Sequence, residues 1–290
     1  MVTSSRVFLL GGGTGSAAIN TIHSAVIQAD GTLGAFTSAG TLPTVLAHSS
    51  VVVTSSRVFL LGGHNGSAAI NTIFSATINS DGTLSEFTSA GTLPTVLAHS
   101  SVVVTSSRVF LLGGWVGSGN ITNAIFSATI NSDGTLSAFT SAGTLPSILY
   151  TSSVVVTSSR VFLLGGGFRD TPATVNAVDT IFSATINADG TLSTFTSAGT
   201  LPSVLFHSTA VITSSRVFLL GGHVGNLTLN TIFSAPLVGG SGLNNYSPFY
   251  TNFSIASTTP SGSSTATHFT LPNAILKEQL LPGNFVYIKT

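Results

Sequence analysis

The feature that most constrains this chain is the segment SSRVFLLGG, which occurs five times. Successive copies are separated by 51, 51, 52 and 56 residues, measured between their arginines. A period of this length is typical of propeller blades, in which no unit can bury its apolar surface alone. The chain is therefore predicted to be a tandem array of five similar units, anchored by Arg6, Arg57, Arg108, Arg160 and Arg216.

Each unit contains four predicted strands, which in the second repeat span 49–53, 58–61, 72–79 and 83–91. The first two are continuous β-branched and apolar runs, as expected of strands covered on both faces, whereas the third alternates as a half-buried strand does. Asp-Gly between the third and fourth strands favours a tight hairpin, because type I′ turns need positive φ. The pairing is therefore predicted to be antiparallel.

Five four-stranded antiparallel units predict an all-β propeller, with blades repeated radially around a channel. A length of 290 residues suits one such domain, and 43% hydrophobic residues supply a large core. The apolar runs are too short to cross a bilayer, so no membrane insertion is expected. Only 6% of residues are charged and the formal net charge is zero, which removes the usual electrostatic basis for binding nucleic acid.

The repeat unit resembles a kelch repeat, in which a diglycine follows an apolar strand and precedes two spaced aromatic residues and an LP…H segment. In the second repeat these positions are Gly62, Gly63, Phe74, Phe87, Pro94 and His99. Phe74 and Phe87 stand where the family usually has Tyr and Trp. The resemblance covers about residues 1 to 250 and implies a β-propeller with five repeat-derived blades.

Two regions are expected: propeller repeats at 1–251 and a non-repeat segment at 252–290. The second region is a candidate for a degenerate sixth blade, for a strand that completes the first blade, or for a docking tail. Within the propeller, the VFLL strands are expected near the ring interior and the spaced aromatic residues between blades. These are Phe74 and Phe87 with their counterparts His23, Phe36, Phe126, Phe139, Phe182, Phe195, Phe233 and Tyr246.

One end of each blade carries the hairpin turns with Asp30, Asp81, Asp133 and Asp189. The repeated arginines begin the second strand at this same end. Arg57, Arg108 and Arg160 are therefore expected near turn aspartates, whereas Arg216 lacks its own because Gly240 stands at that position. Such exposed pairs contribute little stability.

The opposite end of the blades holds all the length variation. Counted from the residue after the diglycine through the third-strand aromatic position, the connecting segment has 11 residues in repeats one, two and five, 12 in repeat three and 16 in repeat four. A surface that differs from blade to blade is the expected place for recognition. We call this end the loop face. Its candidate ligand-binding residues are His64, Trp115, Phe168, Arg169, Asp170 and His223.

Each candidate has a structural alternative. Trp115, the only tryptophan, either stacks on a sugar or protein ligand or folds over the blade edge. Arg169 and Asp170 either bind a ligand or pair with each other. His48, His99 and His207 share one register with Thr151, and this repetition favours a structural hydrogen bond. One imidazole per blade is expected to lie too far from the next for metal ligation.

The composition also limits the chemistry. Zero cysteines exclude disulfides, thiolate metal sites and cysteine nucleophiles, and no metal or cofactor is expected. Glycoside hydrolysis usually requires two facing carboxylates, yet the only glutamates are Glu86 and Glu278, and the loop face offers only Asp170 and Asp179. The chain is therefore not expected to be an enzyme.

The favoured function is an extracellular or virion-surface binding and structural module, such as a phage tail or fibre component or an adhesin. Its partners would be a glycan or protein receptor and neighbouring subunits of a larger assembly. An intracellular kelch-type interaction scaffold is the alternative, although a more charged surface is expected of one. A carbohydrate-active enzyme is the third possibility.

Overall fold

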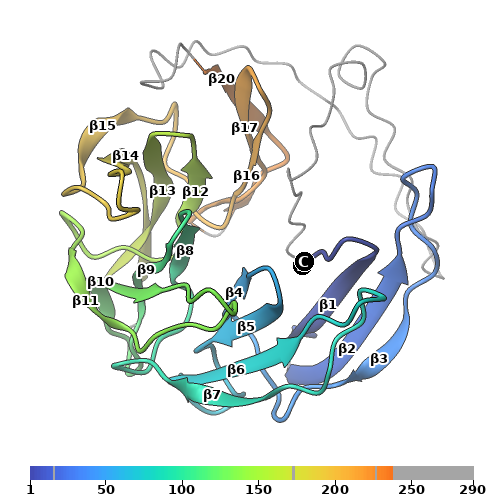
Figure 1. Ribbon diagram of the computed structural model, residues 1–290. Coiled ribbons are helices and arrows are strands. Elements are labelled where there is room, and N and C mark those ends of the chain that lie inside the picture. Colours follow the sequence, from blue (N-terminus) through green and yellow to red (C-terminus); the bar gives the residue numbers. More distant parts are fainter. Residues whose placement is uncertain (16, 172–173, 226, 238–290) are drawn as a thin grey trace.

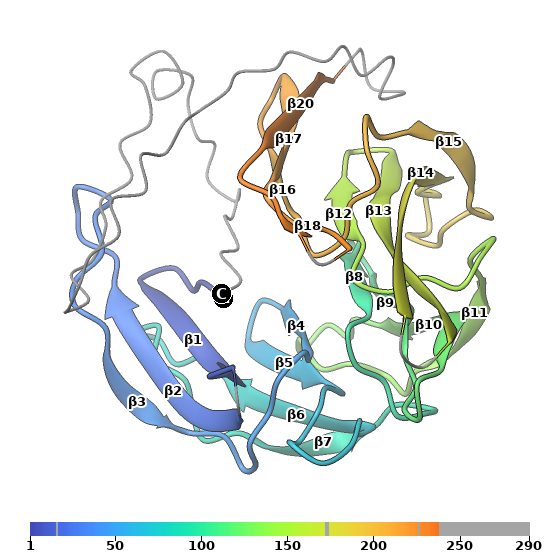
Figure 2. The same ribbon diagram turned by 180° about the vertical axis from the view of Figure 1, so that it is seen from behind.

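The protein is a five-bladed β-propeller in which the blades follow one another around a central axis (Figures 1 and 2). The computed structural model describes residues 1–15, 17–171, 174–225 and 227–237. Within these ranges every regular element is a β-strand, and no helix capable of spanning a membrane is found. The predicted all-β propeller fold is confirmed.

Blades 2, 3 and 4 each have four antiparallel strands, ordered from the axis outward. Blade 2 consists of β4 (Ser50–Val53), β5 (Arg57–Leu61), β6 (Thr72–Thr77) and β7 (Thr88–Thr92). Blade 3 consists of β8 (Ser101–Val104), β9 (Arg108–Trp115), β10 (Ile121–Thr129) and β11 (Thr140–Thr144). Blade 4 consists of β12 (Ser153–Val156), β13 (Arg160–Thr171), β14 (Thr174–Thr185) and β15 (Thr196–Thr200).

The first and last blades have three main strands each. Blade 1 consists of β1 (Arg6–Gly13), β2 (Ala18–Val26) and β3 (Thr37–Thr41), and an isolated bridge pairs Val2 with Val7. Blade 5 consists of β16 (Thr209–Ile212), β17 (Arg216–Leu220) and β20 (Ile232–Pro236). A short hairpin of β18 (His223–Val224) and β19 (Leu227–Thr228) extends blade 5.

The inner strands of successive blades, β4, β8, β12 and β16, contact one another around the axis. The VFLL strands are therefore second from the axis, and they are buried on both faces as predicted. In β5, Val58 and Leu60 pack toward blade 1, whereas Phe59 and Leu61 pack toward blade 3. This is the two-residue alternation of a strand, with an apolar neighbour on each side.

The third strand is more buried than its alternating pattern predicts. In β6 the four residues from Ile73 to Ala76 are all buried, including Ser75 at 3% exposure. Ser75 is accommodated because the guanidinium Nη1 of Arg57 donates a hydrogen bond of 3.2 Å to its hydroxyl. Arg6, Arg160 and Arg216 bond in the same way to Ser24, Ser183 and Ser234. The exposed strand is instead the fourth, with the sequence TSAGT.

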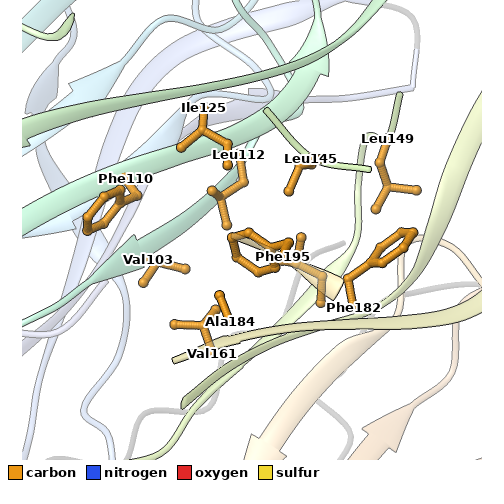
Figure 3. Close-up of a cluster of buried hydrophobic side chains, with 11 residues drawn as sticks. Val103, Phe110, Leu112, Ile125, Leu145, Leu149, Val161, Phe182, Ala184 and Phe195 are labelled. Atoms are coloured by element: carbon orange, nitrogen blue, oxygen red, sulfur yellow. The ribbon is translucent and has the colours of Figure 1, made fainter. Parts of the chain in front are cut away.

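Four apolar clusters fill the interfaces between successive blades. Phe87, Phe139 and Phe195 lie in three of them with 4%, 5% and 2% exposure, as predicted for aromatic residues between blades. Figure 3 shows Phe195 with Phe182 and their aliphatic neighbours between blades 3 and 4. Phe74 is also buried, and Phe126 and Phe233 are partly buried against these clusters.

Blade 1 is the exception, because the prediction that Phe36 is packed between blades is wrong. Phe36 is 42% exposed, and Leu9 is 50% exposed although its counterpart Leu60 is fully buried. Both residues point to the side on which the described part of the chain places no preceding blade. The expected closing segment at 252–290 and Tyr246 lie outside the described residues.

At the end of the blades that carries the hairpin turns, blades 1 to 4 are each hydrogen-bonded to their neighbour in the series. The hydroxyls of Thr54 and Ser56 donate to the carbonyl oxygens of Gly134 and Asp133 in the following blade, both at 2.8 Å. The same pair of bonds joins blade 1 to blade 2 and blade 3 to blade 4. We call this contact the turn latch.

The turn latch also changes the expected pairing of arginine with aspartate. Arg57 and Arg108 act on Asp133 and Asp189, which belong to the following blade. The main cause that holds the pKa of Asp133 below its usual value is the Thr135 hydroxyl, and Arg57 lowers it further. For Arg160 the clearest partner is Ser183, and the Gly240 turn expected beside Arg216 lies outside the described residues.

Replacing Phe87 with Ala should destabilise the propeller by about 3 to 5 kcal/mol, because it leaves a cavity between blades 1 and 2. The matched change Phe36→Ala, at an exposed position, should cost less than about 1 kcal/mol. Urea unfolding monitored by circular dichroism measures both. Equal losses would show that Phe36 is buried in solution.

The turn latch can be isolated with two glycines whose backbone is alike. Gly134 and Gly31 both have φ of +81°, so an alanine is equally strained at either position. A Cβ on Gly134 would collide with the Ser56 hydroxyl, whereas one on Gly31 meets nothing within 4 Å. Gly134→Ala should therefore lower stability by about 1 to 3 kcal/mol more than Gly31→Ala. Equal unfolding midpoints would mean that the latch contributes nothing.

Candidate functional site

The segment that enters each inner strand carries one residue to the axis at the loop face. These residues are His48, His99, Thr151 and His207, with φ of 57°, 57°, 54° and 55°. Their amides form a chain around the axis: His99 N–H donates to His48 O at 3.0 Å, and Thr151 N–H donates to His99 O at 3.1 Å. His207 N–H continues it to Thr151 O at 3.4 Å. A left-handed backbone costs about 1 to 3 kcal/mol for such residues, most obviously for a β-branched threonine.

The side chains of this register converge, and the expectation that one imidazole per blade lies too far from the next is wrong. The rings of His48 and His99 are stacked with centroids 3.9 Å apart, and His207 meets His99 edge-on at 5.9 Å. The short chain around the axis brings them together. Among the described residues there is nevertheless no group of three or more His, Cys, Asp or Glu side chains suited to an ion.

The residues after the diglycines also lie near the axis at the loop face. At Gly62, φ is +61° and a Cβ would collide with the carbonyl oxygen of Leu97, so only glycine permits this turn toward the axis. The strand then pairs with the segment that enters its own blade. The pairs are His64 with Ala47, Trp115 with Ala98, Gly167 with Tyr150, and His223 with Phe206.

These two sets of residues form a cluster of rings at the end of the channel, which we call the channel mouth. His64 stacks on Trp115 at 5.7 Å, and Tyr150 lies edge-on to His99 at 6.0 Å. His223, on β18 (Figure 2), is 6.0 Å from His207. Phe206 lies between them, 5.1 Å from His207 and 5.6 Å from His223. Five of the seven histidines of the chain therefore lie at one end of the channel.

A cavity of about 120 Å³ opens beneath these rings. Hydroxyl contacts involving two of its lining residues join neighbouring blades: the hydroxyls of Ser50 and Ser100 are 2.8 Å apart, and those of Ser153 and Ser208 are 2.7 Å apart. Every described lining residue is a histidine, serine or threonine. The lining consists of His48, Ser49, His99, Ser100, Ser101, Thr151, Ser152, His207, Ser208 and Thr209.

Two buried polar atoms of the channel mouth have no hydrogen-bond partner among the described residues: Nε1 of Trp115 and Oγ1 of Thr151. An unsatisfied buried group of this kind costs about 1 to 3 kcal/mol. Most buried polar groups in proteins are hydrogen-bonded, so such atoms call for an explanation. A bound ligand is one way to supply a missing partner to either atom.

Of the six predicted site residues, His64 and Trp115 lie against each other, and His223 lies against Phe206 and His207. Trp115 is half-buried, and its ring stacks on that of His64. The fourth-repeat stretch expected to be a loop is instead an extended hairpin of β13 and β14. Phe168 is half-buried in β13, and the backbones of Arg169 and Asp170 continue the same strand.

The sequence analysis assigned the axial residues His48, His99 and His207 to a structural hydrogen bond and did not place them in the site, and it did not identify Tyr150 or Phe206. The signal for the histidines was present in their shared register. The repeat pattern does not show where these side chains point, because that direction depends on the positive φ that turns each of them toward the axis.

Comparison with known proteins supports the fold only. No protein-family model matches the chain, and no curated protein sequence is significantly similar to it. Among solved structures, 237 chains match, which marks the architecture as widespread. One, described as "Structure of YjhT", has a TM-score of 0.65 and 12% sequence identity over 83% of this chain and 81% of that one. At this identity the likeness defines a β-propeller and carries no function.

Proposed function

We propose that this propeller is a non-enzymatic binding module that recognises a glycan or a protein through the channel mouth on the loop face. The observation that carries the proposal is the ring cluster with its two buried polar atoms, Nε1 of Trp115 and Oγ1 of Thr151. A half-buried indole beside imidazole and hydroxyl groups provides both an apolar surface and hydrogen-bonding partners, as sugar and protein ligands require.

The repeat composition supports a role outside the cell or on a virion, as part of a larger assembly. Few charges and a fourth strand of Ser, Thr, Ala and Gly give the blades a neutral hydroxyl-rich rim. The kelch-like repeat pattern is equally compatible with an intracellular interaction scaffold, and that is the alternative. Co-purification of the native protein with particles or filaments, rather than with soluble complexes, would distinguish the two.

The proposal of a non-enzymatic role rests on composition. The chain has eight acidic residues, and the repeats place one aspartate in each of four hairpin turns, at the opposite end of the blades from the channel mouth. Paired acid and base carboxylates for hydrolysis are therefore not supplied by the repeated pattern.

Trp115→Ala should weaken ligand binding at least tenfold, since stacking on an aromatic ring and its flanking contacts is commonly worth about 1 to 3 kcal/mol. His64→Ala should weaken it less, because it removes only the ring that supports the indole. Glycan-array binding and pull-down from host-cell surface extracts measure the two ligand classes. The control is Phe36→Ala, which also removes a ring but lies on blade 1 away from the mouth.

Unchanged binding by the Trp115→Ala variant would contradict this site and move recognition to the segment at 252–290. Loss of binding by the Phe36→Ala control as well would mean that the effect is not specific to the mouth, which would also contradict the assignment.

A further inference from the structure

We infer that the cavity of the channel mouth is a binding site for an oxyanion, a carboxylate, sulfate or phosphate group, held among His48, His99, His207 and Thr151. The inference deepens the proposed function by naming the chemical class of the ligand. The claim that the anion is part of a glycan or protein ligand rests on the proposed function. The anion site itself is argued from the residues that line the cavity.

The lining is rich in groups that donate hydrogen bonds to anions. Ten described residues surround the cavity, and all have either a hydroxyl or an imidazole side chain. No aspartate or glutamate is among them. In a chain with as many acidic as basic residues, a cavity without described carboxylates is selective for negative rather than positive ligands.

The imidazoles supply the charge. Imidazole ordinarily gains a proton between about pH 8 and pH 5, and a hydrogen bond from a charged donor to an oxyanion is about twice as strong as one between neutral groups. His48 and His99 are stacked at 3.9 Å and His207 is 5.9 Å from His99, so an anion at these rings would interact with more than one imidazole. The other titratable groups at the mouth are His64, His223 and Tyr150.

Thr151 supplies the neutral donor. Its hydroxyl is buried at the cavity and has no hydrogen-bond partner in the described part of the chain. Its backbone takes the same left-handed conformation as the three histidines, although threonine is disfavoured there. A donor held in this way, opposite imidazoles from three other blades, fits an oxygen of a bound anion.

A metal cation is the competing ligand for histidines, and the geometry disfavours it. Stacked rings 3.9 Å apart with an angle of 23° between their planes do not direct their nitrogen lone pairs at one point. The described residues contain no group of three or more His, Cys, Asp or Glu side chains that suits an ion. The cavity is also large enough, at about 120 Å³, for a tetrahedral anion.

The repeats themselves suggest matched variants, because both His and Thr occur at this register with nearly equal φ. His99→Thr copies blade 4 into blade 3 and removes the central imidazole without changing the backbone requirement. Thr151→His makes the opposite change and completes a set of four imidazoles. Circular dichroism and thermal unfolding verify that both variants fold.

The probe is sodium sulfate, titrated calorimetrically into the full chain at about pH 5.5 and about pH 8, with ionic strength fixed by sodium chloride. Sulfate should bind at least tenfold more tightly at the lower pH. His99→Thr should weaken binding at that pH about tenfold, and Thr151→His should strengthen it. NMR titration of the histidine ring protons should show pKa values raised by sulfate.

A second comparison separates free anions from anionic ligands. A sulfated oligosaccharide should bind more tightly than inorganic sulfate, and it should also bind more tightly than its desulfated form. Trp115→Ala should abolish the difference between the sulfated oligosaccharide and inorganic sulfate, but it should leave the difference between the sulfated and desulfated oligosaccharides. Loss of oligosaccharide binding with intact sulfate binding would contradict the proposed function alone. No sulfate binding at either pH, or binding that His99→Thr leaves unchanged, would overturn the anion site.

Discussion

Each blade of this propeller has two apolar faces, and the packing of one blade against the next is the interaction on which everything else depends. Val58 and Leu60 point to one neighbour while Phe59 and Leu61, from the same strand, point to the other. A single sheet with both faces apolar cannot be stable in water, so each blade requires two partners. Leu9 and Phe36 are exposed because the described residues provide no partner for the face of blade 1 on which they lie.

This packing also limits where the repeats can differ. Interface residues must fit a neighbour that is itself nearly a copy, and the turn latch between Ser56 and Asp133 requires the same turn in the following blade. Sequence changes are therefore tolerated at the loop face, after the diglycine, where a strand end has left the interface. One register there differs between neighbouring blades: in blades 2 to 5 it holds His64, Trp115, Gly167 and His223. The residues on the two sides of a blade at this register are therefore different for each blade.

The sequence was sufficient to predict the blades because their signals are local and repeated five times. The Asp-Gly turn, the VFLL run and the diglycine each favour one backbone shape, and their agreement across copies leaves little freedom. The burial of Ser75 was not predictable from alternation, because it depends on the guanidinium of Arg57 folding over the sheet. Phe36 was misplaced because a repeat pattern says nothing about which copy lacks a neighbour.

The site was harder to predict because it is made by the ring and not by any one repeat. Three of the six predicted residues, His64, Trp115 and His223, lie at the loop end of the channel, but the axial residues there come from the start of the inner strands. A histidine or threonine at positive φ is unfavourable in any single blade. Only around a shared axis do those four residues gain amide bonds to one another, and only there do their side chains enclose a cavity. Backbone strain and unsatisfied polar atoms are thus concentrated at the mouth, whereas turn latches join blades 1 to 4 at the opposite end. This is the partition expected when one end of a scaffold stabilises and the other recognises.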